Sequence, residues 1–295
     1  MASDELPILV GVDGSEQSQA AIDLGVREAR LRGRSLRLVH AFVWRELGVY
    51  VGPSPEGPPD GGLLNDAKRL LDGALARARA SAGDTPVTAE LIDGPVVPVL
   101  LREAERAELV VLGNRGLGGF TGLLVGSVAV ELAAHAPGPV LVARGTIRAD
   151  GPVVVGVDPD ADTLAVDFAF EAAAARDAEL VAIHAWSGRL ADEDEAELPL
   201  IYEPSDVQRE QERRLTEFIA EARARYPGVR VRPQVQPGRP ARILVEASKS
   251  AQLVVVGARG RGGFAGLLLG SVSQALLHHA HCPVAIARRQ PSRVG

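Results

Sequence analysis

The fold of this chain is decided by the stretch LVVLGNRG at residues 109–116, an apolar run that ends in a loop with two glycines. A short apolar run bounded by turn signals is typical of a strand buried on both faces of a sheet. After nine further residues come Gly126 and Ser127, which precede a helical pattern. The succession of strand, glycine-rich loop and helix predicts one step of an α/β fold.

The same stretch returns as LVVVGARG at residues 253–260, followed at the same spacing by Gly270 and Ser271. Two further segments also repeat, His40-Ala41 as His184-Ala185 and Gly11-Val12-Asp13 as Gly156-Val157-Asp158. The separation of positions 109 and 253 is far too long for a solenoid repeat, so each copy is a whole domain. We therefore expect two tandem domains, at residues 1–146 and 151–290, joined near the glycine-bearing stretch 145–151.

Apolar runs alternate with helical patterns within each copy. In the first copy a helix is expected over residues 15–32, and strands over 8–12, 36–40, 87–91, 109–112 and 140–143. Near-continuous apolar strands separated by helices predict a parallel sheet with helices on both faces. The segments 45–62 and 187–205 are rich in proline, glycine or acidic residues and are expected to be long surface loops.

Composition narrows the class of protein. An apolar fraction of 46% is sufficient for folded cores, and a net charge of −6 opposes non-specific binding to nucleic acid. Cys282 is the only cysteine, which excludes an internal disulfide. The start of the chain has no signal-peptide pattern, and the apolar run near 123–143 is broken by Glu131, Pro137 and Pro139, so no membrane span is predicted. These features favour a soluble cytoplasmic protein.

The two glycine loops suit a polyphosphate ligand. Glycines let the backbone approach a ligand closely, successive N–H groups can form an anion-binding nest, and the following helix adds the positive end of its dipole. Arg115 and Arg259 supply positive charge, and Ser127 and Ser271 are placed to cap the helices that follow. The alternative is that the glycines only permit tight turns between strand and helix.

The loops are not P-loops. The chain has no G-x-x-x-x-G-K-[ST] motif, and its only lysines, Lys68 and Lys249, lie outside both loops, so fast phosphoryl transfer is not expected. Asp13 and Asp158 end the first strands. Each can bond a ribose hydroxyl or share a Mg²⁺ with phosphates, or else form an Asx turn or a helix cap. His40 is expected to be structural rather than catalytic, as is His184.

At these positions the sequence resembles the universal stress protein family, in its nucleotide-binding branch. The resemblance covers nearly the whole chain in two copies. It rests on Gly11-Val12-Asp13-Gly14-Ser15, His40-Ala41, the G-x-x-G-x₉-G-S loop and Pro139-Val140-Leu141-Val142. It implies sheets of five parallel strands in the order 3-2-1-4-5, and an ATP site with Mg²⁺ in each domain. It also implies pairing through the fifth strand, so the domains would form a pseudo-dimer, and a homodimer of tandem chains is expected.

The resemblance also implies roles for the matching residues. Gly11, Val12 and Ala41 would hold the adenine through their backbone, Asp13 would contact the ribose or the metal, and the glycine loop with its serine would hold the phosphates. The residues assigned in the first copy are Gly11, Val12, Asp13, Ala41, Gly113, Arg115, Gly116, Gly119, Gly126, Ser127 and Val128. Those in the second copy are Gly156, Val157, Asp158, Ala185, Gly257, Arg259, Gly260, Gly263, Gly270, Ser271 and Val272.

The second copy departs from the pattern where Pro159-Asp160 replaces Gly14-Ser15. Proline removes a backbone donor, and Asp160 adds negative charge near the expected phosphates unless it caps the next helix and points away. Two like charges ~4 Å apart repel by roughly 4 kcal/mol at an effective dielectric constant of ~20. We therefore expect the second site to bind ATP more weakly, or with more dependence on Mg²⁺, than the first.

Three functions fit the sequence. The leading hypothesis is an ATP-dependent regulator in stress response or growth arrest, which acts on a protein partner that the sequence does not identify. The alternative is a slow ATPase or autophosphorylating enzyme that uses Ser127 or Ser271, although no general base stands beside either serine in the sequence. The third is an interaction scaffold whose pockets stay empty.

Overall fold

The computed structural model describes residues 5–43, 62–116, 125–186, 204–260 and 269–289. The chain divides into two compact units. The first unit runs to Arg144 and takes in the segment that begins at Arg288, and the second unit is Gly145–Ala287. The change of unit therefore falls at the edge of the glycine-bearing stretch 145–151.

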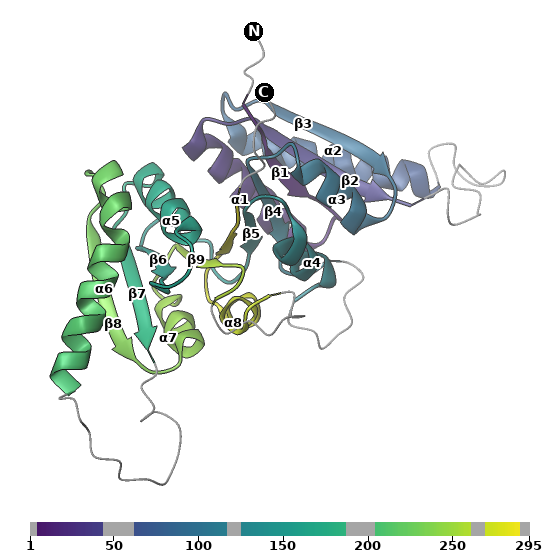
Figure 1. Ribbon diagram of the computed structural model, residues 1–295. Helices are drawn as coiled ribbons and strands as arrows, with labels where there is room; N and C mark the ends of the chain where they lie inside the picture. Colours follow the sequence, from purple (N-terminus) through teal and green to yellow (C-terminus); the bar gives the residue numbers. More distant parts are fainter. Residues whose placement is uncertain (1–4, 44–61, 117–124, 187–203, 261–268, 290–295) are drawn as a thin grey trace. The chain divides into compact units, whose positions relative to one another are not determined.

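The first unit, coloured purple to teal in Figure 1, alternates strands and helices throughout. Its elements are β1 (Ile8–Gly11), α1 (Glu16–Arg32), β2 (Leu36–Phe42), α2 (Leu63–Ala82), β3 (Val87–Asp93), α3 (Val96–Ala104), β4 (Leu109–Gly113), α4 (Ser127–His135) and β5 (Val140–Ala143). All strand pairs in this unit are parallel, and the strands lie in the order β3-β2-β1-β4-β5. The expected order 3-2-1-4-5 is confirmed.

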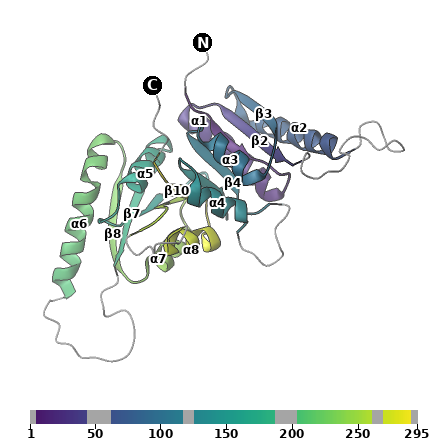
Figure 2. The same ribbon diagram turned by 45° about the vertical axis from the view of Figure 1, so that its right-hand side comes forward.

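The second unit repeats this architecture (Figure 2, where β10 is labelled). Its elements are β6 (Val153–Gly156), α5 (Leu164–Ala175), β7 (Leu180–Trp186), α6 (Pro204–Arg225), β8 (Val231–Pro237), α7 (Pro240–Ala247), β9 (Leu253–Gly257), α8 (Ser271–His279) and β10 (Val284–Ala287). The strands are again parallel, in the order β8-β7-β6-β9-β10. The predicted α/β fold with two tandem copies is thus confirmed.

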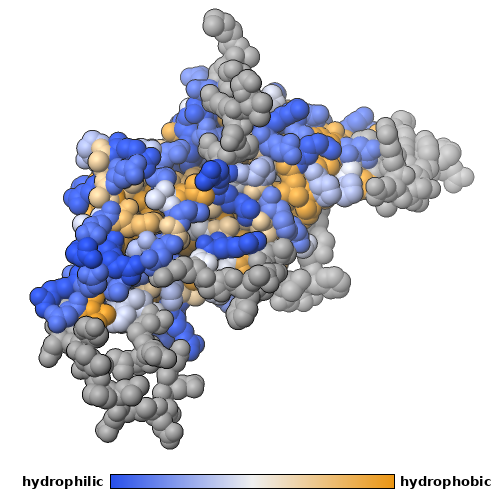
Figure 3. Space-filling view, viewed as in Figure 1, coloured by the Kyte–Doolittle hydropathy of each residue, from blue (hydrophilic) through white to orange (hydrophobic). Residues whose placement is uncertain are grey.

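Helices cover both faces of the sheet in the first unit. α1 packs beside α2 and α3 beside α4, and Figure 1 shows the two pairs on opposite faces. α2 buries Leu71, Ala74 and Ala78, which recur at helical spacing and form its inner face. In Figure 3 hydrophilic residues cover the outer side of α6, which carries exposed Arg213 and Glu217.

The central strands are buried on both sides, as their unbroken apolar sequences predict. Ile8, Leu9 and Val10 of β1 each have 0% of their surface exposed. The edge strand β3 differs, because its residues alternate between half-buried and exposed, with Glu90 reaching Arg37 at 2.6 Å. β3 extends to Asp93, two residues beyond the strand expected over 87–91.

The helix expected over residues 15–32 agrees with the structure to within one residue. α1 begins at Glu16, and Ser15 is its N-cap, with Oγ accepting a hydrogen bond from the Ser18 N–H. The predicted loops 45–62 and 187–205 lie outside the described residues except at their ends, and positions 204 and 205 already belong to α6. The second copy starts its first helix later, at Leu164, and this helix has 12 residues against 17 in α1.

The position of β1 determines where a ligand can enter. β1 pairs with β2 on one side and β4 on the other. Connections to the two neighbours use helices on opposite faces, so a crevice opens between the carboxyl ends of β1 and β4. β6 occupies the same place in the second unit, between β7 and β9.

Two helix glycines give opposite predictions for one substitution. A Cβ atom at Gly25 of α1 would overlap Cγ2 of Val10 in β1, whereas a Cβ at Gly73 of α2 would have no neighbour within 4 Å. We expect Gly25→Ala to lower the free energy of unfolding by about 1–2 kcal/mol through overpacking. Gly73→Ala should raise it by up to about 1 kcal/mol through helix propensity.

Urea unfolding followed by circular dichroism measures both variants against the unmodified chain. A Gly25→Ala protein as stable as the original would show that α1 does not lie this close to β1.

Candidate functional site

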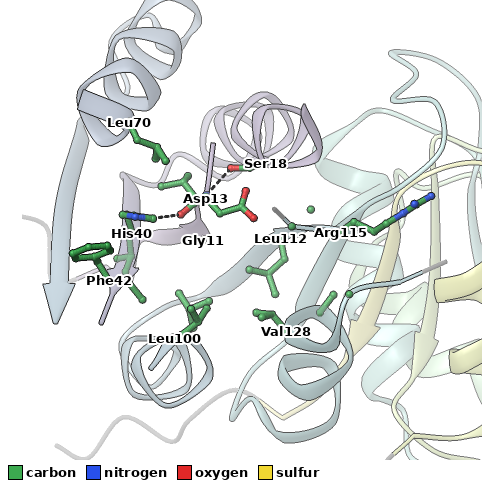
Figure 4. Close-up of a pocket in the computed structure, with 18 of the residues that line it drawn as sticks. Gly11, Asp13, Ser18, His40, Phe42, Leu70, Leu100, Leu112, Arg115 and Val128 are labelled. Atoms are coloured by element: carbon green, nitrogen blue, oxygen red, sulfur yellow. Dashed lines mark hydrogen bonds between the residues drawn. The ribbon is translucent and has the colours of Figure 1, made fainter. Parts of the chain in front are cut away.

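A cavity of about 840 Å³, named here the first crevice, opens at the carboxyl ends of β1, β2 and β4 (Figure 4). Helices α1, α2, α3 and α4 and the glycine loop after β4 contribute its remaining walls. Its lining residues are Gly11, Val12, Asp13, Ser18, Val39, His40, Ala41, Phe42, Leu63, Asp66, Ala67, Leu70, Val96, Leu100, Leu112, Gly113, Arg115, Gly116, Val125, Gly126, Ser127, Val128 and Ala129. Such a volume accommodates a ligand of nucleotide size.

The structure brings together the residues assigned in the first copy. Gly11, Val12, Asp13, Ala41, Gly113, Arg115, Gly116, Gly126, Ser127 and Val128 all line the first crevice. Gly119 lies outside the described residues. Parallel strands place their carboxyl ends at one edge of the sheet, so residues more than 100 positions apart meet here.

Sequence reasoning missed the apolar wall of the first crevice. Leu63, Ala67 and Leu70 from α2 line it, together with Val96 and Leu100 from α3. The three α2 residues stand four and three positions apart, which places them on one helical face. This spacing was a usable signal, but it does not reveal that the face turns toward the ends of β1 and β2.

The first crevice has an apolar end and a cationic end. In Figure 4 Phe42, Leu70 and Leu100 lie on one side, Arg115 lies on the other, and Asp13 stands between them. Leu63 and Val96 are the large apolar residues of the described chain that remain exposed, at 46% and 40%. The arrangement matches an amphiphilic ligand whose apolar ring and anionic tail point in opposite directions.

Asp13 is held in place by the start of α1. Its Oδ1 accepts hydrogen bonds from the backbone N–H of Ser15 at 3.0 Å and from the Ser15 hydroxyl at 2.7 Å. Its own N–H donates to the Ser18 hydroxyl at 3.1 Å. Of the two structural roles left open by the sequence, Asp13 takes the Asx turn, while Ser15 is the cap. Oδ2 lies against Gly116, where a Cβ atom would overlap it.

The glycine loop closes on itself at the start of α4. The N–H of Gly126 donates to the carbonyl of Asn114 at 2.7 Å, and Gly126 is the N-cap residue. The expectation that Ser127 caps α4, or that Ser271 caps α8, is wrong, because glycines occupy both cap positions with no side-chain cap bond. These two helices therefore present first-turn N–H groups without a side-chain acceptor, which favours an anion.

Positive charge gathers beside this loop. Arg115 lines the first crevice and follows β4. Arg144 directly follows β5, the strand that pairs with β4. Burial lowers the pKa of Arg144, and the charge of Arg115 lowers it further. An anion bound at the loop would reduce this repulsion between the two guanidinium groups.

His40 is fixed by a backbone bond. Its Nδ1 lies 2.7 Å from the carbonyl oxygen of Val12, so Nδ1 carries the proton in this tautomer. The ring also stacks on Phe42, with 6.4 Å between ring centroids. His40 thereby aligns β2 with the residue that follows β1.

The second unit places its assigned residues at the corresponding ends of strands and helices. These residues, which define the second site, are Gly156, Val157, Asp158, Ala185, Gly257, Arg259, Gly260, Gly270, Ser271 and Val272. Gly263 lies outside the described residues. The loop is closed as in the first unit, by a bond of 2.9 Å from the N–H of Gly270 to the carbonyl of Ala258.

Asp160 has a role that neither sequence interpretation anticipated. Thr163, not Asp160, is the N-cap residue of α5. The backbone N–H of Asp160 donates to Oδ1 of Asp158 at 3.2 Å, and its carboxylate forms an ion pair of 2.6 Å with Arg214 of α6. Asp160 is therefore neither a helix cap nor an unneutralised charge.

Within the described ranges, no three His, Cys, Asp or Glu side chains are grouped so that they could hold a metal ion. None of the helices that the structure describes combines the length and the apolar composition needed to span a membrane.

Comparison with known proteins identifies the two units. Residues 6–144 and 151–288 each match the universal stress protein family. The chain belongs to this family. Among curated proteins, the universal stress proteins Rv2005c and Rv2623 of Mycobacterium tuberculosis (strain H37Rv) are each 39% identical to it, over 293 and 299 residues respectively. These alignments cover 96% and 97% of this chain, and 97% of each relative.

A solved structure supports the same assignment of fold. The crystal structure of a universal stress protein from Archaeoglobus fulgidus aligns with 98% of this chain and 100% of its own, with a TM-score of 0.68 and 19% identity. At this identity the likeness concerns the fold alone.

The single cysteine of this universal stress protein lies away from both sites. Cys282 is fully buried just before β10, and burial raises the pKa of its thiol to about 12. A thiol is nucleophilic only as the thiolate, so this side chain acts as a small apolar residue of the core.

We expect Cys282 to resist alkylation in the folded chain. At a pH of about 8.5 fewer than roughly one thiol in a thousand would be ionised when folded, against about half when unfolded. Mass spectrometry after brief iodoacetamide treatment should find one modified thiol per chain in urea and almost none in buffer. Equal modification in both would contradict the burial of this residue.

Proposed function

We propose that this universal stress protein is an ATP-binding regulator of a stress response, with the nucleotide in the first crevice. The observation that carries the proposal is the polarity of that cavity, apolar at the Phe42 and Leu70 end and cationic at the Arg115 end. Adenine suits the apolar end, and a triphosphate suits the glycine loop and the uncapped start of α4. The ribose would then lie beside Asp13.

The fit of Mg²⁺ rests on Asp13. The described residues offer no three-ligand cluster, so a cation here would have to be shared between the Asp13 carboxylate and the phosphate oxygens. Oδ1 already accepts from Ser15, and Oδ2 faces Gly116 of the loop. When bound, Mg²⁺ would supply positive charge against the phosphates, which lessens their repulsion with Asp13.

The chemistry of the lining favours binding over catalysis. The only lysines of the chain are Lys68 and Lys249, and neither lines the first crevice. A P-loop lysine that would reach the β- and γ-phosphates is therefore lacking from this lining. We propose that nucleotide instead shifts the population of ordered loop conformations, and so the affinity for a protein partner, within a cytoplasmic homodimer of tandem chains.

Released nucleotide and thermal stability test the function directly. Protein purified in Mg²⁺ and then denatured should release adenine nucleotide, which chromatography identifies. Added Mg-ATP at about 100 times its Kd should stabilise the fold by about 2.7 kcal/mol, which raises Tm by roughly 4–9 °C. GTP at equal concentration should shift Tm less. No shift with any adenine nucleotide would leave the empty scaffold as the better account.

A matched pair of substitutions tests the role of the crevice. Gly116→Ala places a methyl group onto Asp13 Oδ2, whereas at Gly260 the corresponding methyl would lie 3.8 Å from Asp158 Oδ2. We expect Gly116→Ala to weaken Mg-ATP binding at least about tenfold, because it displaces the carboxylate between loop and ribose. Gly260→Ala should have the smaller effect. Isothermal titration calorimetry measures both, and equal losses would contradict the assignment of the high-affinity site to the first unit.

A further inference from the structure

The second site has different side chains where the first crevice has its apolar wall. Gln211 of α6 stands at the position of Ala67 in α2, and Arg214 at the position of Leu70. Ala67 and Leu70 both line the first crevice. The two helices therefore present a small apolar surface in one unit and long polar side chains in the other.

Gln211 contacts His184, the counterpart of His40 in the second unit. His184 Nδ1 lies 3.0 Å from the carbonyl oxygen of Val157, so Nδ1 is the donor and Nε2 is left as an acceptor. The atom that lies 3.1 Å from Nε2 is Oε1 of Gln211; because Nε2 accepts in this tautomer, the amide bonds the ring with its NH₂ group turned into the position of that oxygen. His184 is only 7% exposed, while His40 in the first unit is half-buried and lines the cavity.

Arg214 forms a second bridge beside it. In the first unit Leu70 packs against Gly14, where a Cβ atom would come within 2.8 Å of Leu70 Cδ1. In the second unit Arg214 instead reaches Asp160 at 2.6 Å, with side chains 32% and 30% exposed. The ion pair joins α6 to the segment after β6. In the first unit the corresponding elements are α2 and the turn at Gly14, which meet through the apolar contact of Leu70.

In the second unit a side-chain hydrogen bond also joins α8 to the end of β9. The hydroxyl of Ser273, which is 2% exposed, donates to the carbonyl of Gly257 at 2.8 Å. Its counterpart in the first unit is Ala129, which has no hydroxyl. The described ends of the loop keep the Gly270 to Ala258 bond, and a side-chain bond from α8 to the end of β9 is added.

From these contacts we infer that the chain binds one adenine nucleotide, in the first unit, and that the second site is closed to the base by its own side chains. The inference rests on the proposed function. A base entering the second site must separate Gln211 from a buried imidazole, which leaves a buried acceptor unpaired, and must also displace the partly exposed ion pair of Arg214 and Asp160, whose groups water can reach. We expect affinity there to be at least about 30-fold lower than in the first crevice.

Calorimetric titration of the full chain with Mg-ATP measures the stoichiometry, with Mg-GTP as the comparison. One site per chain supports the inference. Two sites of similar affinity would overturn it while supporting the proposed function, and no binding would overturn both. Gly116→Ala locates the site, since a single high-affinity site must weaken in this variant and remain unaltered in Gly73→Ala.

An exchange of residues between the units tests the cause. The triple variant Asp160→Ser, Gln211→Ala and Arg214→Leu copies Ser15, Ala67 and Leu70 into the second unit. It should gain a second binding site.

The reciprocal variant Ala67→Gln and Leu70→Arg should lose the first binding site, with unchanged far-ultraviolet circular dichroism. A folded triple variant that still binds one nucleotide would overturn the role of these side chains. If the triple variant does not fold, the reciprocal variant decides, since undiminished ATP binding there would overturn that role as well.

Discussion

The contact between Asp13 and Gly116 depends on the neighbouring positions of β1 and β4, and the rest of the site depends on that contact. Only because the two strands pair can a carboxylate after one reach a loop after the other. The carboxylate is in turn oriented by Ser15, which also begins α1. The Asp13 carboxylate, the turn that follows it and the start of α1 are therefore coupled, and a change at any of them moves the others.

Much of the fold could be predicted from the sequence because two strong signals coincide. Strands such as Leu109–Gly113 are apolar without interruption, and the chain repeats this pattern, so each copy supports the interpretation of the other. The strand ends were less predictable in β2 and β3, which run to Phe42 and Asp93, two residues past the strands expected over 36–40 and 87–91. The strand order and the roles of single residues came from family resemblance and not from periodicity.

The candidate site was only partly accessible to the same reasoning. Glycines and aspartates after a strand predict a loop from residue type alone. Leu63 and Leu70 have no such signal, because only the packing of α2 places them beside the strand ends. The capping prediction at Ser127 failed because glycine can adopt the cap position itself, one residue earlier. Asp160 was misread for a related reason, since its partner Arg214 stands on another helix, 54 residues away.

If an anion binds at the uncapped start of α4, as proposed, it would also affect the order of that helix. A helix whose first N–H groups lack a side-chain acceptor frays more easily at that end, and an anion placed there completes the hydrogen bonding that the sequence leaves out. The first turn of α4 would then be more ordered when the anion is bound than when it is absent. That turn is continuous with Leu132 and Ala133 in the core, so the signal would enter the protein through a rigid element.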